Sequence, residues 1–252
     1  MIEKNQTYFA LIEASNQPGC PLCRLVSDAV EKHLENLLYE NVNDGILRNE
    51  LRQSLGFCNL HAWLIIDAGV GSALGISIIY HDVLSNILKG LPDIEIMTQP
   101  ENVFRRLFKM APRSVREYVN RVSQVIRPQG ECPACLQQER STELVVSVLV
   151  DSLLDEKLAD RLTLSDGLCL PHLDRAIRKV RDERTLSVLV ALNREKYSSL
   201  NQELSEIIRK SDYRFQAEGF GEEGDAWRRV VAMLAGGQRL GDIRERNESR
   251  QE

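Results

Sequence analysis

The sequence carries two short motifs, each present twice, whose cysteines and histidines have the spacing of metal ligands. The first is a CxxC motif with proline after its first cysteine, and the second is a CxxH motif a little over thirty residues downstream. A CxxC motif lets two thiolates converge on one ion from a tight turn. A CxxH motif at a helix start places a sulfur and an imidazole nitrogen on the same face. The eight residues are Cys20, Cys23, Cys58, His61, Cys132, Cys135, Cys169 and His172.

The spacing of the motifs predicts two metal sites, and we expect zinc in both. Each half of the chain supplies three sulfurs and one nitrogen, the ligand set of a tetrahedral zinc ion. We therefore expect the first four ligands in one site and the last four in the other. Four protein ligands close the coordination shell, which favours structural over catalytic metal. Ligand identity alone leaves an iron–sulfur cluster as the alternative.

The cysteine count argues against disulfides. All six cysteines lie inside the motifs, three in each half, so they cannot pair off within a half. The amino terminus, MIEKNQTYFALIEAS, lacks the basic segment and apolar run of a secretory leader. We therefore expect a cytoplasmic protein, in a compartment where thiols stay reduced and clustered cysteines are metal ligands.

The motif offsets indicate an internal duplication. Subtracting 20 from 132 gives 112, and subtracting 58 from 169 gives 111, so the two copies differ by one residue. Apolar residues at helical spacing follow the first CxxC up to Gly45, and a shorter helix ends at Gly56. The second copy repeats this plan over 136–154 and near 158–162. The sequence predicts an all-α protein of two pseudo-repeated helical units, each clamped by its own Cys3His site and joined by a helical connector.

Three further helices are predicted outside the paired segments. The apolar stretch from Trp63 to Tyr80 contains Asp67 and three glycines, which favours a buried helix broken near 69–71 over a membrane span. One long amphipathic helix is expected after His172, with its inner face running from Leu186 to Ile207. A short helix is expected over 227–234, with Asp225 as its amino-terminal cap.

The chain divides into four predicted segments. Residues 1–90 and 130–212 are the two metal-binding repeats, 91–129 is a basic helical connector, and 213–252 holds the last helix and a polar tail. The connector could meet phosphate groups of an anion or a nucleic acid through Arg105, Arg106, Lys109, Arg113 and Arg116. A net charge of -5 for the whole chain favours a solvated helical face instead.

No recognised catalytic motif is present. Residues 219–224 match GxGxxG, but no predicted strand precedes them and two glutamates would face a pyrophosphate, so a dinucleotide site is not expected. His33 and His81 lie on predicted helices without a second ligand nearby and are interpreted as packed or solvated side chains. We therefore predict no catalytic residue.

The combined pattern resembles a prokaryotic family known as the domain of unknown function 6062 family. The resemblance rests on the doubled CPxC and CxxH motifs, the stretch from Ser211 to Phe215, and the stretch from Gly224 to Arg228. It covers nearly the whole chain and implies a metal-binding helical protein without an assigned reaction. All eight ligand positions fit the family pattern.

The leading hypothesis is a non-enzymatic, two-site zinc scaffold that presents a surface to an unidentified macromolecular partner. An iron–sulfur redox protein or sensor is the first alternative, and nucleic-acid binding through the connector is the second. No membrane association is expected, and the oligomeric state is left open.

Overall fold

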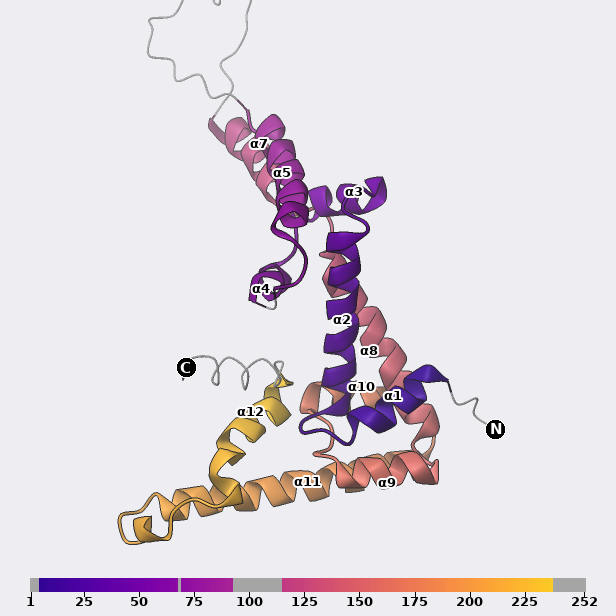
Figure 1. Ribbon diagram of the computed structural model, residues 1–252, viewed down its shortest axis with the longest axis vertical. Coiled ribbons are helices and arrows are strands. Elements are labelled where there is room, and N and C mark those ends of the chain that lie inside the picture. Colours follow the sequence, from indigo (N-terminus) through magenta and orange to yellow (C-terminus); the bar gives the residue numbers. More distant parts are fainter. Residues whose placement is uncertain (1–4, 68, 93–114, 238–252) are drawn as a thin grey trace, which may run out of the picture. The chain divides into compact units, whose positions relative to one another are not determined.

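The computed structural model describes residues 5–67, 69–92 and 115–237, and these residues form an all-α fold. They contain α-helices, two short 3-10 helices and no strand, which confirms the predicted fold class (Figure 1). In order, the helices are α1 Gln6–Ala14, α2 Pro21–Tyr39, α3 Gly45–Gln53, α4 Asn59–Asp67, α5 Ala73–Gly90, α7 Val115–Ile126, α8 Pro133–Ser152, α9 Glu156–Leu164, α10 Leu170–Lys179, α11 Glu183–Lys210, η1 Gln216–Glu218, η2 Glu222–Asp225 and α12 Ala226–Ala235.

Local sequence signals explain where these helices begin. α2 and α8 each start at a proline, whose fixed φ suits the first helical position and whose missing N–H costs nothing there. Asp44 caps α3 by accepting from the Leu47 N–H, and Ser72 caps α5 by accepting from the Gly75 N–H. The predicted helices after both CxxC motifs are thereby confirmed.

The described chain divides into two compact units. Unit 1 comprises the described parts of Met1–Glu31 and Gln137–Glu252, and unit 2 those of Lys32–Leu136. Each unit thus contains one CxxC pair and one CxxH pair, taken from different halves of the sequence. The division into four sequence segments stays a prediction.

Unit 1 is organised around one apolar core. α1 packs on α9, and α12 packs on both α10 and α11. Leu11, Leu149, Leu153 and Leu158 have no exposed surface, and full burial of a leucine contributes about 1.5–3 kcal/mol. The buried members of this core are Tyr8, Leu11, Ile12, Leu22, Val26, Val145, Val146, Leu149, Leu153, Leu158, Leu162, Leu168, Ala176 and Leu189.

Unit 2 is built on α5, which packs against both α3 and α7 (Figure 1). Leu34, Leu38, Leu51, Ile65 and Ile79 are its most deeply buried aliphatic side chains within the described residues. Gly75, in the first turn of α5, lies so close to the end of α2 that an added Cβ would stand 2.5 Å from the Leu38 carbonyl oxygen. Glycine is therefore required at this helix contact.

Three helix predictions need correction or refinement. The stretch from Trp63 to Tyr80 is broken where predicted, with Gly69 and Gly71 at positive φ between α4 and α5. It is not uniformly buried, because the Trp63 side chain is 60% exposed. None of the helices in the described ranges is long and apolar enough to cross a membrane.

The segment after His172 is not one helix, because α10 ends at Lys179 and α11 begins at Glu183 with Asp182 as its cap. Asp225 precedes the last helix as predicted, but its side chain caps no N–H. It pairs with Arg229 at 2.7 Å instead, since η2 leads directly into α12 and leaves no extended residue for capping.

Candidate metal centres

The structure gathers all eight predicted ligands into two groups of three cysteines and one histidine. In each group the four donor atoms all lie within 4.8 Å of one another. We call the first group the α2/α10 centre; it consists of Cys20, Cys23, Cys169 and His172. The second is the α4/α8 centre, which consists of Cys58, His61, Cys132 and Cys135.

The grouping of the ligands differs from the sequence-based expectation. We expected each half of the chain to hold its own complete set. Instead, the CxxC pair of each half joins the CxxH pair of the other half. The expectation of one self-contained Cys3His clamp per half is therefore wrong. Nearly equal spacing in the two halves is compatible with either grouping, so the motifs carried no signal to distinguish them.

Helix starts position every ligand pair. The first cysteine of each motif directly precedes a helix. Its carbonyl oxygen accepts a hydrogen bond from the backbone N–H four residues later. The acceptor and donor pairs are Cys20 with Arg24, Cys58 with Ala62, Cys132 with Leu136 and Cys169 with Leu173. The second ligand is the third residue of the same helix. Two helix amino termini therefore meet at each centre, and their partial positive charge stabilises anionic sulfur.

The α2/α10 centre is compact. The Nδ1 atom of His172 lies 3.1 Å from the sulfur of Cys169, 3.3 Å from that of Cys23 and 3.7 Å from that of Cys20. The Cys23 and Cys169 sulfurs are 3.5 Å apart. Cys169 is buried, with 1% of its surface exposed.

The α4/α8 centre has nearly the same dimensions. The Nδ1 atom of His61 lies 3.2 Å from the sulfur of Cys58, 3.4 Å from that of Cys135 and 3.8 Å from that of Cys132. The Cys58 and Cys135 sulfurs are 3.5 Å apart. His61 and Cys132 are buried, whereas Cys58 and Cys135 are partly exposed.

These distances match donors arranged around one tetrahedral ion. Zinc bonds of about 2.3 Å to sulfur and about 2.0–2.1 Å to nitrogen place two sulfurs about 3.8 Å apart and a sulfur and nitrogen about 3.6 Å apart. The separations given above run from 3.1 to 3.7 Å at the α2/α10 centre and from 3.2 to 3.8 Å at the α4/α8 centre, and all donors of a centre lie within 4.8 Å of one another. Each centre therefore could hold a metal ion.

The electrostatics of both centres favour a cation. Burial raises the pKa of the Cys20 thiol well above its usual value, and hydrogen bonds from the Cys169 and Cys20 thiols lower the pKa of Cys23. Burial opposes protonation of His172, but hydrogen bonds with the Cys169 and Cys23 sulfurs raise its pKa to about 9. Burial also raises the pKa of Cys135 to about 12. Closely packed thiolates repel one another, and positive charge among them relieves that repulsion.

Two side chains of α11 hold the backbone just before Cys169. The amide oxygen of Asn193 accepts from the Leu168 N–H at 2.8 Å, and the Tyr197 hydroxyl donates to the Leu168 carbonyl at 2.9 Å. Asn193 is buried, and its amide nitrogen donates to the Leu189 carbonyl at 2.8 Å. The residue that leads into the CxxH motif is thus fixed at both of its backbone polar groups.

The α4/α8 centre has a comparable support. The Tyr80 hydroxyl is hydrogen-bonded to the backbone of Phe57, the residue before Cys58. Burial and the negative sulfurs raise the pKa of both Tyr80 and Tyr197, the latter to about 12. In each centre, therefore, a tyrosine is hydrogen-bonded to the backbone of the residue that precedes the CxxH motif.

The α2/α10 centre receives one further contact that sequence reasoning missed. The Gly237 N–H, two residues beyond the end of α12, donates to the Cys23 sulfur at 3.3 Å. Backbone donors carry no sequence signature, so this contact could not be predicted. The sequence analysis also did not predict the supporting roles of Asn193, Tyr197 and Tyr80. The available signal was that all three residues lie on predicted helices.

Of the five candidate basic residues of the connector, one lies within the described ranges. Arg105, Arg106, Lys109 and Arg113 fall outside the described residues, and Arg116 is exposed on α7. The GxGxxG stretch forms η2 and its flanking turn, where Glu223 pairs with Lys210 at 2.7 Å. Gly224 therefore lies in a short helix that is held to α11.

Comparison with known proteins identifies the family of this chain. The model of a family of unknown function, DUF6062, matches residues 5–240, a span that includes both metal-ligand groups. The chain belongs to the DUF6062 family. This DUF6062 protein is also 24% identical over 230 residues to an uncharacterized 23.9 kDa protein in the xynA 3' region of Caldicellulosiruptor sp. (strain Rt8B.4). That match covers 90% of this chain and 100% of the relative. No solved structure matches this chain.

Proposed function

We propose that this DUF6062 protein is a cytoplasmic, two-site zinc-binding helical scaffold that presents a surface to another macromolecule. The observation that carries the proposal is the pair of Cys3His groups, each with its four donors within 4.8 Å. Three thiolates and one imidazole suit zinc, and reduced thiols suit the cytoplasm.

The spacing of the donors supports a single ion over an iron–sulfur cluster. In a cluster, different ligands bind different iron atoms, so the donors must stand further apart than donors that share one ion. The 3.5 Å separation between Cys23 and Cys169, and between Cys58 and Cys135, suits one shared ion. An iron–sulfur redox protein or sensor is retained as the second candidate because its ligand types are the same.

A structural role for the metal follows from the closed shell and from the helices that each centre joins. Four protein donors leave no position for water or substrate. One centre joins the starts of α2 and α10, and the other joins the starts of α4 and α8, pairs that are far apart in sequence. Metal binding of this kind contributes on the order of 10 kcal/mol to folding.

Exposed apolar side chains support the interaction role. On α4, Leu60, Trp63 and Ile66 recur at intervals of three residues and are each more than half exposed. On α12, Trp227, Val231 and Leu234 lie one turn apart and are also more than half exposed. Apolar stripes of this kind on soluble proteins mark contact surfaces.

Elemental analysis combined with an absorption spectrum tests the proposal. Protein purified without added metal and without oxygen should contain two zinc ions per chain and be colourless. Removal of the metal with a chelator should abolish cooperative unfolding. Bound iron with broad visible absorption would instead support the redox candidate, and metal-free protein with unchanged stability would exclude both.

A further inference from the structure

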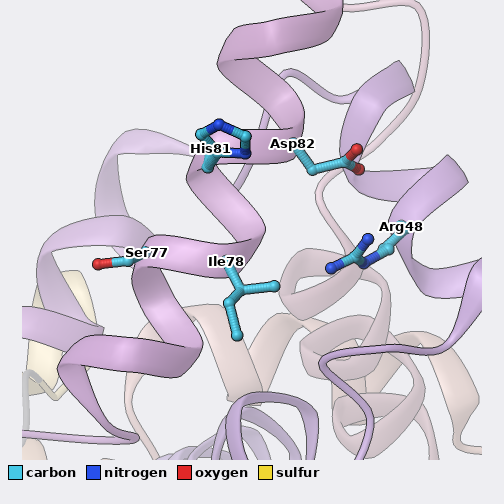
Figure 2. Close-up of a pocket in the computed structure, with 5 residues that line it drawn as sticks. All are labelled: Arg48, Ser77, Ile78, His81 and Asp82. Carbon is cyan, nitrogen blue, oxygen red and sulfur yellow. The ribbon is translucent and has the colours of Figure 1, made fainter.

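A small hollow between α3 and α5 lies apart from both metal-ligand groups. Its volume is about 360 Å³, and its lining residues are Arg48, Ser77, Ile78, His81 and Asp82. Arg48 reaches into it from α3, and the other four side chains come from α5 (Figure 2). All five belong to unit 2, whose α3 and α5 pack on each other.

The charges around this hollow leave a positive group available. Asp82 is the one acidic lining residue, and Arg52 engages both of its carboxylate oxygens, at 2.9 and 3.1 Å. Arg48 donates through Nε to the Val42 carbonyl at 2.9 Å, which fixes its side chain and uses one of its five N–H groups. Within the described ranges, no carboxylate pairs with Arg48. Its two terminal nitrogens therefore retain their donors while the nearby acid is neutralised.

The other lining residues indicate what kind of ligand body could be attached to an anionic group in this hollow. Ile78 offers a half-buried apolar wall, and Ser77 and His81 are exposed on the adjoining turns of α5. A guanidinium fork binds a carboxylate with two parallel hydrogen bonds, and a short hydrocarbon body suits an isoleucine wall.

We infer that this hollow binds a small organic carboxylate, with Arg48 holding the carboxylate and Ile78 contacting the apolar body. Arg52 acts as a positioning residue, because it keeps the Asp82 carboxylate from repelling the ligand. The site is open to solvent and has a single anchoring cation, so affinity is modest, with Kd on the order of 1 mM. This site is independent of the metal centres and of their proposed role.

Titration of the full-length, metal-loaded protein tests the inference. Sodium butyrate is added at constant ionic strength, binding is followed by NMR shifts of α3 and α5 amides, and inorganic phosphate is the second arm. Saturable shifts with butyrate are expected, with at least fivefold weaker binding of phosphate. Phosphate binding as tight as butyrate binding would overturn the carboxylate assignment, and absence of saturable shifts would overturn the site.

Three variants locate the binding. Arg48→Gln should weaken butyrate binding at least fivefold, and Arg52→Gln should weaken it by a smaller factor by releasing Asp82. Lys89→Gln removes one positive charge from the last turn of α5, outside the lining, and should leave Kd within twofold. Should Arg48→Gln unfold, Arg48→Lys keeps the charge without the planar fork and should weaken binding at least twofold. Equal Kd values for wild type and the Arg48 variants would overturn the inference.

Discussion

The main-chain N–H of Gly237 donates a hydrogen bond to the Sγ atom of Cys23, 214 residues earlier in the chain. The turn that makes this contact depends on Gly236, whose φ of 92° ends α12 in a conformation that favours glycine. Because α12 packs on α10, the same helix that carries the donor also rests against the helix that carries His172. The end of α12 is thus part of the α2/α10 centre.

Removing this donor should weaken metal binding at one centre only. Gly237→Pro lacks the N–H, whereas Gly237→Ala keeps it, and a Cβ there would make an ordinary 3.5 Å contact with Cys23. A hydrogen bond to a charged acceptor contributes about 1.5–3 kcal/mol, so about tenfold or greater weakening is expected for the proline variant. Competition with a zinc chelator measures it. Identical release from the proline and alanine variants would contradict the prediction.

Paired serine substitutions can establish which ligands share an ion. In the crossed grouping, Cys20→Ser with Cys169→Ser damages one centre, so one zinc per chain should remain. Cys20→Ser with Cys58→Ser damages both, so neither site should hold zinc tightly. The opposite result, two sites lost in the first variant and one in the second, would restore the arrangement of one site per half. Metal content after gel filtration distinguishes these outcomes.

Motif spacing predicted which residues form the two groups but not how the motifs pair. The CxxC and CxxH spacings identified all eight residues that the structure gathers into two groups, because the spacing within a motif is a local property of a turn and a helix start. Which CxxC meets which CxxH depends on the path of the chain between them, and motif spacing does not encode that path. The helices were similarly predictable from apolar periodicity, except near α10 and α11, where no glycine or proline marks the break at 180–182.

Burial of individual side chains was less predictable than helix position. Trp63 follows His61 by two residues and was expected to enter the core, yet it is 60% exposed. On a short helix whose first turn carries a residue of a Cys3His group, that residue decides which face turns inward. His61 is 2% exposed, so the face of α4 that carries it is the inner one.

Asn193 should be necessary for the stability of the α2/α10 centre. Asn193→Leu removes the acceptor of the Leu168 N–H and leaves that donor buried, which costs about 1–3 kcal/mol. Asn201→Leu on the same helix is a matched control, because that side chain is exposed. Urea unfolding of the zinc-loaded proteins measures both. A midpoint for Asn193→Leu equal to that of the control would show that the hydrogen bond contributes nothing.

Removing only the hydrogen-bond partner of the Leu168 carbonyl should have a milder effect. Tyr197→Phe removes only the hydroxyl that donates to the Leu168 carbonyl, and a carbonyl that loses a partner is tolerated better than an orphaned N–H. About 0.5–1.5 kcal/mol of destabilisation is expected. Tyr80→Phe removes the oxygen that accepts from the backbone of Phe57, the equivalent residue at the α4/α8 centre, and should destabilise that centre. The two substitutions should each weaken zinc binding at their own centre, measured by the same chelator competition.

The ion pair between Arg175 and Glu139 should contribute little to stability despite its short contacts. The Arg175 guanidinium lies 2.5 and 2.7 Å from the two Glu139 oxygens and lowers the pKa of that carboxyl. A folded-state pKa below the unfolded value stabilises the fold above the unfolded pKa, and the contribution is lost as pH falls through the folded value.

At pH 7 that contribution is fully present, but both side chains are more than a third exposed and the pair is screened by water and salt. A double-mutant cycle of Arg175→Gln and Glu139→Gln should therefore give a coupling energy below about 1 kcal/mol that shrinks further in 1 M salt. Urea unfolding of the four proteins of the cycle, compared at pH 7 and at equal metal content, measures the coupling. A salt-independent coupling well above that bound would mean that the pair is shielded from solvent in the folded protein.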